Sequence, residues 1–184
     1  MSERVALTLW PEWAYAVAHL GKDVENRSWS PPPYVFRKRI AIHGGASIGG
    51  RSSAKTGFAL TAVRAMTDVA EMCGHDQARL RSITPGVISE EGCGIVAIAT
   101  IAGVWRSPQP ERWYVGDNLH GCLLEDVIAL PRPVKCSGAQ GLWRIPPEVL
   151  ARVREQLAVA RTQAAQASGS RPPGTASNVK KESK

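Results

Sequence analysis

The chain has 184 residues, of which 43% are hydrophobic, and its formal net charge is +7 at pH 7. This length and apolar content suit one domain with a single core and a short tail. No run approaches the ~18 uninterrupted apolar residues of a membrane helix, and the N-terminus has no basic, apolar and small-residue signal pattern, so we expect no membrane partner and a cytoplasmic location.

The first predicted elements are a strand over Arg4–Leu9 and a helix that begins at Pro11, where the missing backbone N–H costs nothing. Gly21 is placed to end this helix as a C-cap residue. Strands are predicted next over Val24–Trp29 and, after three prolines, over Arg39–His43. Helical spacing predicts that the first helix buries one face, formed by Trp10, Trp13, Ala14 and Val17.

The middle of the chain predicts a helix and two long strands. Apolar residues recur at helical spacing over Ser53–Cys73, which predicts an amphipathic helix. His75–Gly92 is polar and contains a Pro-Gly pair, so we expect a short helix followed by an exposed loop. The β-branched run Gly94–Trp105 predicts a central strand, and Cys122–Leu130 predicts another that ends before the next proline.

The last predicted elements are a strand over Leu142–Ile145 and a helix that starts at Pro146 and Pro147. Beyond about Ala167 the residues are mainly Ser, Gly, Pro and Lys, which predicts a disordered tail. The helix would turn inward the apolar residues Val149, Leu150, Val153 and Leu157.

Strands outnumber the helices that could serve as parallel crossovers, and no repeat is visible. The fold class that follows is α+β, a small and mostly antiparallel β-barrel with flanking helices. We divide the chain into a barrel domain at 1–147 with a helical insertion at about 49–92, a C-terminal helix at 148–167 and a disordered basic tail at 168–184.

The densest group of reactive side chains lies between Gly21 and Trp29. Lys22 occupies a turn, and the period of two in a strand places Glu25, Arg27 and Trp29 on one face. A lysine beside a carboxylate can hold a lowered pKa, an arginine can clamp a planar edge, and a tryptophan can stack on a base. The alternative from spacing alone is a surface ladder of ion pairs.

Further candidates surround this group. His43 ends a strand, where a structural role competes with that of a base or proton carrier. Gln140 lies in a glycine-flanked turn and can read a base edge or simply pack there. Trp10 and Trp143 lie in apolar patterns and are predicted core residues, which leaves Trp29 as the stacking candidate.

Basic residues favour an anionic partner and concentrate in two places, the C-terminal tail and segment 34–55, which contains no acidic residue. Within the segment we expect phosphate contacts from Arg37, Lys38, Arg39 and Arg51. Gly49–Thr56 approaches the phosphate loop of nucleotide hydrolases, but Ala54 replaces its second glycine. The alternative interpretation of this segment is a helix N-terminus that binds a phosphate of a nucleic-acid backbone, without nucleotide hydrolysis.

The four cysteines are Cys73, Cys93, Cys122 and Cys136, and they lie far apart. Zinc sites use close pairs, and secreted scaffolds use a higher density of cysteines. We therefore expect reduced thiols, no metal and no cofactor.

Three stretches resemble the opening of ASCH domains: Trp10–Ala14, Gly21–Trp29 and Ile40–His43. Leu123–Val127 and Gly138–Trp143 resemble the family's second half. The resemblance implies a PUA-like barrel whose cleft is lined by Lys22, Glu25 and Arg27, and a role in RNA or modified-nucleoside metabolism.

Some small bacterial members of that family hydrolyse acetylated cytidine with the motif lysine, a threonine three residues later and a distant glutamate. Glu25 occupies the threonine position here, so the resemblance carries over no threonine nucleophile, and Lys22 and Glu25 remain as an acid and base pair that can act with water. The leading hypothesis is binding of RNA, another single-stranded nucleic acid or a modified nucleoside. The alternatives are an amidohydrolase acting on an acylated nucleoside and a protein-interaction scaffold.

Overall fold

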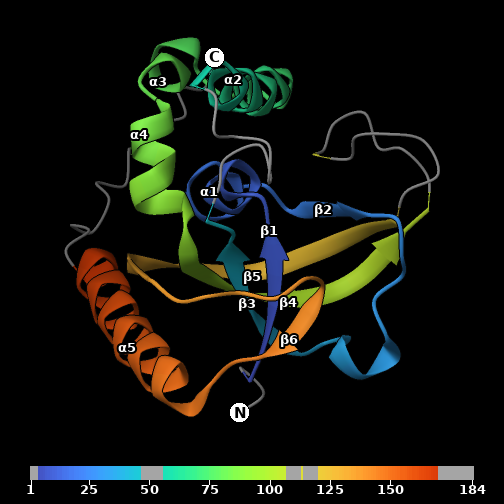
Figure 1. Cartoon of the computed structure of the whole chain (residues 1–184). Helices are drawn as coiled ribbons and strands as arrows, with labels where there is room; N and C mark the ends of the chain where they lie inside the picture. The colour runs from blue at the N-terminus through green and yellow to red at the C-terminus, as the bar shows by residue number, and fades with distance from the viewer. Residues whose placement is uncertain (1–3, 47–55, 107–112, 114–119, 170–184) are drawn as a thin grey trace, which may run out of the picture.

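The computed structural model describes residues 4–46, 56–106, 113 and 120–169, and these form an α+β fold, as predicted (Figure 1). The sheet has the strand order β2-β5-β4-β3-β1-β6. Its described strands are β1 (Val5–Leu9), β2 (Val24–Arg27), β3 (Arg39–Gly44), β4 (Gly94–Trp105), β5 (His120–Val134) and β6 (Leu142–Arg144). All neighbours pair antiparallel except β1 and β3, which are parallel. The sheet is therefore mostly antiparallel, as expected, but mixed.

The sheet curls into a half-open barrel. The pairing of β4 with β5 shifts register at three places, and such irregularities bend a strand pair. Among the described residues no ladder joins the two edge strands, β2 and β6. The two sides of the sheet nevertheless come close together. Arg27 of the edge strand β2 donates a hydrogen bond of 2.5 Å to the carbonyl of Thr8 in β1, which is the neighbour of the other edge strand, β6.

Each face of the sheet is covered by a helix, as the alternation along the strands requires. Leu7 and Ile42 point to the face covered by α1 (Pro11–His19), and Ala6 and Ala41 point to the face covered by α5 (Pro147–Gly169). The predicted inward residues of α5 are all buried, namely Val149, Leu150, Val153 and Leu157. Among the described helices, none combines the length and apolar character needed to cross a bilayer.

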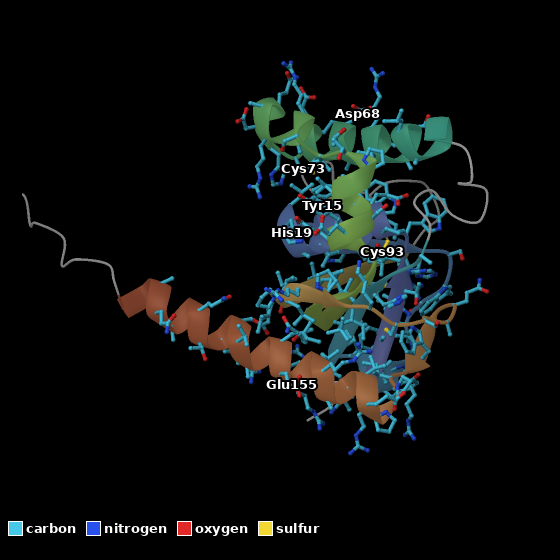
Figure 2. All side chains as sticks on the ribbon, turned by 60° about the vertical axis from the view of Figure 1, so that its left-hand side comes forward. Tyr15, His19, Asp68, Cys73, Cys93 and Glu155 are labelled. Carbon is cyan, nitrogen blue, oxygen red and sulfur yellow. The ribbon has the colours of Figure 1, made fainter. Side chains whose placement is uncertain are left out.

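The inserted helices form a further layer on the outer side of α1. In Figure 2 the upper part of this layer, near Cys73, lies above the helix that carries Tyr15 and His19, and the remainder descends beside that helix toward the sheet. The layer consists of α2 (Thr56–Met72), α3 (Gln77–Arg81), α4 (Pro85–Val87) and the π-helical turn η2 (Ile88–Gly92). One apolar cluster joins α1 to these helices. The predicted start of α2 at Ser53 lies outside the described residues.

Two predictions of local structure are wrong. The expected exposed loop before β4 is helical and buries Ile88, because the Thr84 side chain accepts from the Val87 N–H and Pro85 occupies the first helical turn. β5 continues through Pro131 to Val134, since β2 pairs only with its beginning. Its other edge is open at the prolines, where no ladder bond is lost.

Candidate ligand-binding cleft

A cleft of about 940 Å³ opens where the edges of the half-barrel approach each other. The ends of β1 and β2, the start of α1, the residues after β3 and the turn before β6 supply its walls. The lining residues are Thr8, Leu9, Trp10, Trp13, Glu25, Asn26, Arg27, Ser28, Trp29, Gly45, Ala46, Gln140 and Gly141. A smaller chamber of about 220 Å³ is lined by Trp13, Lys22, Glu25 and Asn26. The two hollows share three lining residues and adjoin.

Lys22, Glu25 and Arg27 form a continuous chain of charges along the wall of these hollows. Lys22 Nζ lies 3.2 Å from Glu25 Oε2, and Arg27 Nε lies 3.1 Å from Glu25 Oε1. The Arg27 Nε–H is not aligned for a hydrogen bond, so that contact is purely ionic. Lys22 also donates to the Val24 carbonyl. A single carboxylate therefore lies between two cations.

The turn after α1 is what buries Lys22. Gly21 adopts a φ of +65°, which favours glycine, and the chain then reverses so that the Lys22 N–H donates to the Ala16 carbonyl. Only 2% of the Lys22 surface is exposed, and its ammonium lies 5.8 Å from the centroid of the Trp13 ring. Burial lowers the pKa of Lys22, against the opposing effect of Glu25.

Tryptophans form much of the remaining wall. Trp29, the predicted stacking residue, is half-buried in the cleft, with the Arg27 guanidinium 5.9 Å from its ring centroid. Trp10 was expected in the core, but it is 55% exposed and lines the cleft. It is the N-cap of α1, outside the helical repeat, and so the spacing rule did not apply to it. Trp13 separates the cleft from the chamber, and sequence spacing alone gave no sign of this role.

Asn26 lines the chamber and is hydrogen-bonded to Trp113. The Asn26 amide donates to the Trp113 carbonyl at 2.9 Å, and the buried Trp113 ring meets Trp13 edge-on at 6.5 Å. Neither residue was predicted for the site. Asn26 lies within the predicted strand, and only its side chain, which turns toward Trp113, brings it to the hollow.

The other predicted ligand-contacting residues are distributed unevenly. Gln140 lines the cleft, whereas His43 is 2% exposed and is absent from the lining. Arg37, Lys38 and Arg39 precede or begin β3, whose opposite end leads to the cleft.

Arg37, Lys38 and Arg39 are not among the lining residues, and on β3 the cleft is reached at the other end of the strand, after Gly44. Figure 1 shows the light-blue segment 33–38 at the lower right, away from α1 and β2. Arg51 lies outside the described residues.

Among the described residues no group of three or more histidines, cysteines and carboxylates is arranged to hold a metal ion. The four cysteines are free thiols. Cys122 lies behind the motif strand, and burial raises the pKa of its thiol to about 12, with a smaller contribution from Glu25. That thiol therefore stays protonated and unreactive at neutral pH.

No protein-family model matches the sequence, and no curated protein is similar to it. Solved structures of an ASCH protein from Zymomonas mobilis are similar to the chain. The first has a TM-score of 0.46 and 14% identity, over 84% of this chain and 96% of that one. A tyrosine-to-phenylalanine variant of that protein has a TM-score of 0.46 and 15% identity, over 83% of this chain and 97% of that one. A serine-to-alanine variant has a TM-score of 0.45 and 14% identity, over 84% of this chain and 98% of that one.

Proposed function

We propose that the cleft binds one flat heterocycle, the base of a modified nucleoside or of an unpaired nucleotide in RNA. The observation that carries this proposal is the joining of an aromatic wall to a charged edge within one hollow of about 940 Å³. Trp29 and Trp10 offer faces for stacking, and every base has a π-face. Arg27 and Gln140 offer hydrogen-bonding groups for the edge of the base.

The buried ion pairs give the site its specificity. Glu25 is held by Lys22 and Arg27, so its orientation is set before any ligand arrives. Pre-organised polar groups in an apolar pocket discriminate by leaving a wrong partner unpaired. This supports recognition of a particular base edge over general adhesion to nucleic acid.

We expect Trp29→Ala to weaken nucleoside binding about 10-fold or more, because stacking contributes roughly 1–3 kcal/mol per base. Binding is measured by titrating the four ribonucleosides, their acylated forms and a short single-stranded RNA against tryptophan fluorescence and by calorimetry. Tyr34→Ala is the matched control, since Tyr34 is 64% exposed and does not line the cleft. Equal losses in both variants, or no binding by any probe, would contradict the proposal.

The salt dependence of the same titration distinguishes a base that belongs to a free nucleoside from one that belongs to an RNA strand. A strand that also contacts Arg37, Lys38 and Arg39 gives an affinity that falls steeply with salt and is lost when all three become glutamate. A free nucleoside makes no such contacts and gives a flat dependence. Arg37, Lys38 and Arg39 do not line the cleft, which favours the nucleoside.

A second candidate function is hydrolysis of an acylated nucleoside, favoured by the environment of Lys22. A buried lysine with a lowered pKa, 3.2 Å from a carboxylate, is suited to proton transfer. Water would attack the amide carbonyl while Lys22 or Glu25 takes its proton. The C–N bond then breaks, and the amine leaves with a proton returned from the pair.

For this candidate we expect wild-type protein to release the acid from an acylated nucleoside, and Lys22→Met to abolish the release. The rate should rise with pH through the lowered pKa of Lys22 if its neutral amine is the base. Products are detected by chromatography and mass spectrometry, with Lys38→Met as the control because Lys38 is exposed and outside the cleft. Binding without turnover across the panel would leave only the binding function.

A further inference from the structure

Thr8 is the residue at which the two walls of the cleft meet. Its carbonyl accepts from Arg27 at 2.5 Å, which attaches the wall formed by β2. Its backbone N–H donates to the Gly141 carbonyl at 3.3 Å, which attaches the wall that carries Gln140. Its hydroxyl oxygen lies 2.9 Å from Trp143 Nε1 and 3.3 Å from His43 Nδ1. One residue of β1 thus bonds to both sides of the hollow.

The donors and acceptors fix the direction of this side-chain network. An indole N–H only donates, so Trp143 gives its proton to the Thr8 oxygen. The Thr8 hydroxyl proton then points to His43 Nδ1, and Nε2–H donates to the Cys136 carbonyl at 3.2 Å. The Cys136 carbonyl can only accept, so Nε2 carries a proton, and in a neutral ring Nδ1 is then the acceptor for the Thr8 hydroxyl. The 2% exposure of His43 agrees, since burial lowers its pKa.

The loop from 135 to 141 is packed onto the same imidazole. A Cβ on Gly138 would lie 2.3 Å from His43 Cε1 and 2.5 Å from Nδ1, so only glycine allows this approach. Trp143 meets the same ring in an edge-to-face arrangement, with centroids 5.5 Å apart. The loop is therefore held at Cys136, Gly138 and Gly141, and Gln140 lies between the last two contacts.

We propose that the hydrogen-bonded chain from Trp143 through Thr8 to His43 positions the Gln140 wall against the Arg27 wall and so sets the width of the cleft. Thr8 and His43 are then positioning residues: His43 acts on the ligand through the loop and does not touch it. This inference rests on the proposed function for its effect on ligands, but the arrangement of the loop can be tested without one.

The test compares Thr8→Val, which keeps the shape and backbone of Thr8 but lacks the hydroxyl, with Thr8→Ser, which keeps the hydroxyl. In wild type and Thr8→Ser, ¹⁵N spectra should show His43 as the Nε2–H tautomer and slow exchange of the Trp143 indole proton. In Thr8→Val we expect mixed tautomers and increased backbone motion at Gln140. An unchanged tautomer and an unchanged Gln140 in Thr8→Val would overturn the proposal.

A double-mutant cycle checks the loop contact by thermal unfolding. Gly138→Ala should be costly beside the native imidazole and nearly neutral in a His43→Ala background, where the methyl group fills the vacated space. Additive effects would overturn the packing argument.

The four ribonucleosides, their acylated forms and a short single-stranded RNA serve as ligand probes. Each probe that binds wild type should bind Thr8→Val at least about 10-fold more weakly than it binds Thr8→Ser. Equal affinity for Thr8→Val and Thr8→Ser would overturn the effect on ligands. A protein that binds no probe but passes the two ligand-free tests would refute the proposed function and leave the positioning network standing.

Discussion

Gly44→Ala is expected to destabilise the protein by at least about 3 kcal/mol, whereas Gly45→Ala should change its stability very little. A Cβ on Gly44 would lie 1.6 Å from the Gly92 carbonyl oxygen and 3.2 Å from the Ala14 methyl group. The closest atom belongs to backbone, so no side-chain rotation relieves the clash. A Cβ on Gly45 would meet its nearest neighbour at 3.6 Å, an ordinary contact.

The measurement is thermal and chemical unfolding of the two single variants beside wild type. For a domain of this size, about 3 kcal/mol corresponds to a fall in Tm of roughly 6–12 °C. Similar Tm values for the two variants would show that η2 does not lie against the end of β3 as described. The test matters for the site because Gly44 lies against Ala14 of α1 and directly precedes Gly45, which lines the cleft.

Much of the fold could be predicted from the sequence because the strands have distinctive composition. β4 was predicted with its observed bounds, since its residues are apolar and rich in β-branched side chains. The parallel pairing of β1 with β3 could not be predicted, because it depends on α1 packing across the sheet and not on any local pattern. The end of β5 was predicted wrongly at Leu130, before Pro131. Whether a proline is tolerated in a strand depends on whether that strand edge is paired, which is a property of the whole sheet.

The site was predictable in its charged part and not in its shape. The period of two in β2 and the turn at Gly21 were enough to bring Glu25 and Arg27 beside Lys22. The roles of Thr8 and Trp10 depend on how the barrel edges approach, which no spacing rule encodes. Sequence order likewise could not show that Arg37, Lys38 and Arg39 lie outside the lining of the cleft, because they precede or begin β3 at the end remote from Gly45.

Glu25→Gln is expected to destabilise the protein by about 3–5 kcal/mol and to abolish ligand binding, because it leaves the Lys22 ammonium buried without its carboxylate. The double variant Lys22→Met/Glu25→Gln should recover most of that stability, since it also removes the buried cation, but it should not recover binding. Glu125→Gln is the control, an exposed change on β5 outside the cleft.

The pH dependence of the stability lost in Glu25→Gln tests whether the buried Lys22 ammonium causes that loss. The pKa of Lys22 is lower in the folded protein than its ordinary value of 10.5, which applies to the unfolded chain. The free energy of unfolding is therefore lowest at pH values below the folded pKa, where Lys22 is protonated in both the folded and the unfolded protein. It rises as pH increases from the folded pKa toward 10.5, because only the unfolded chain is then protonated. Loss of Glu25 lowers that pKa further, so the deficit of Glu25→Gln should narrow between neutral and alkaline pH in chemical unfolding. A deficit that stays constant over that range, or persists in the double variant, would mean that Glu25 stabilises the fold through Arg27 and that Lys22 is not held by it.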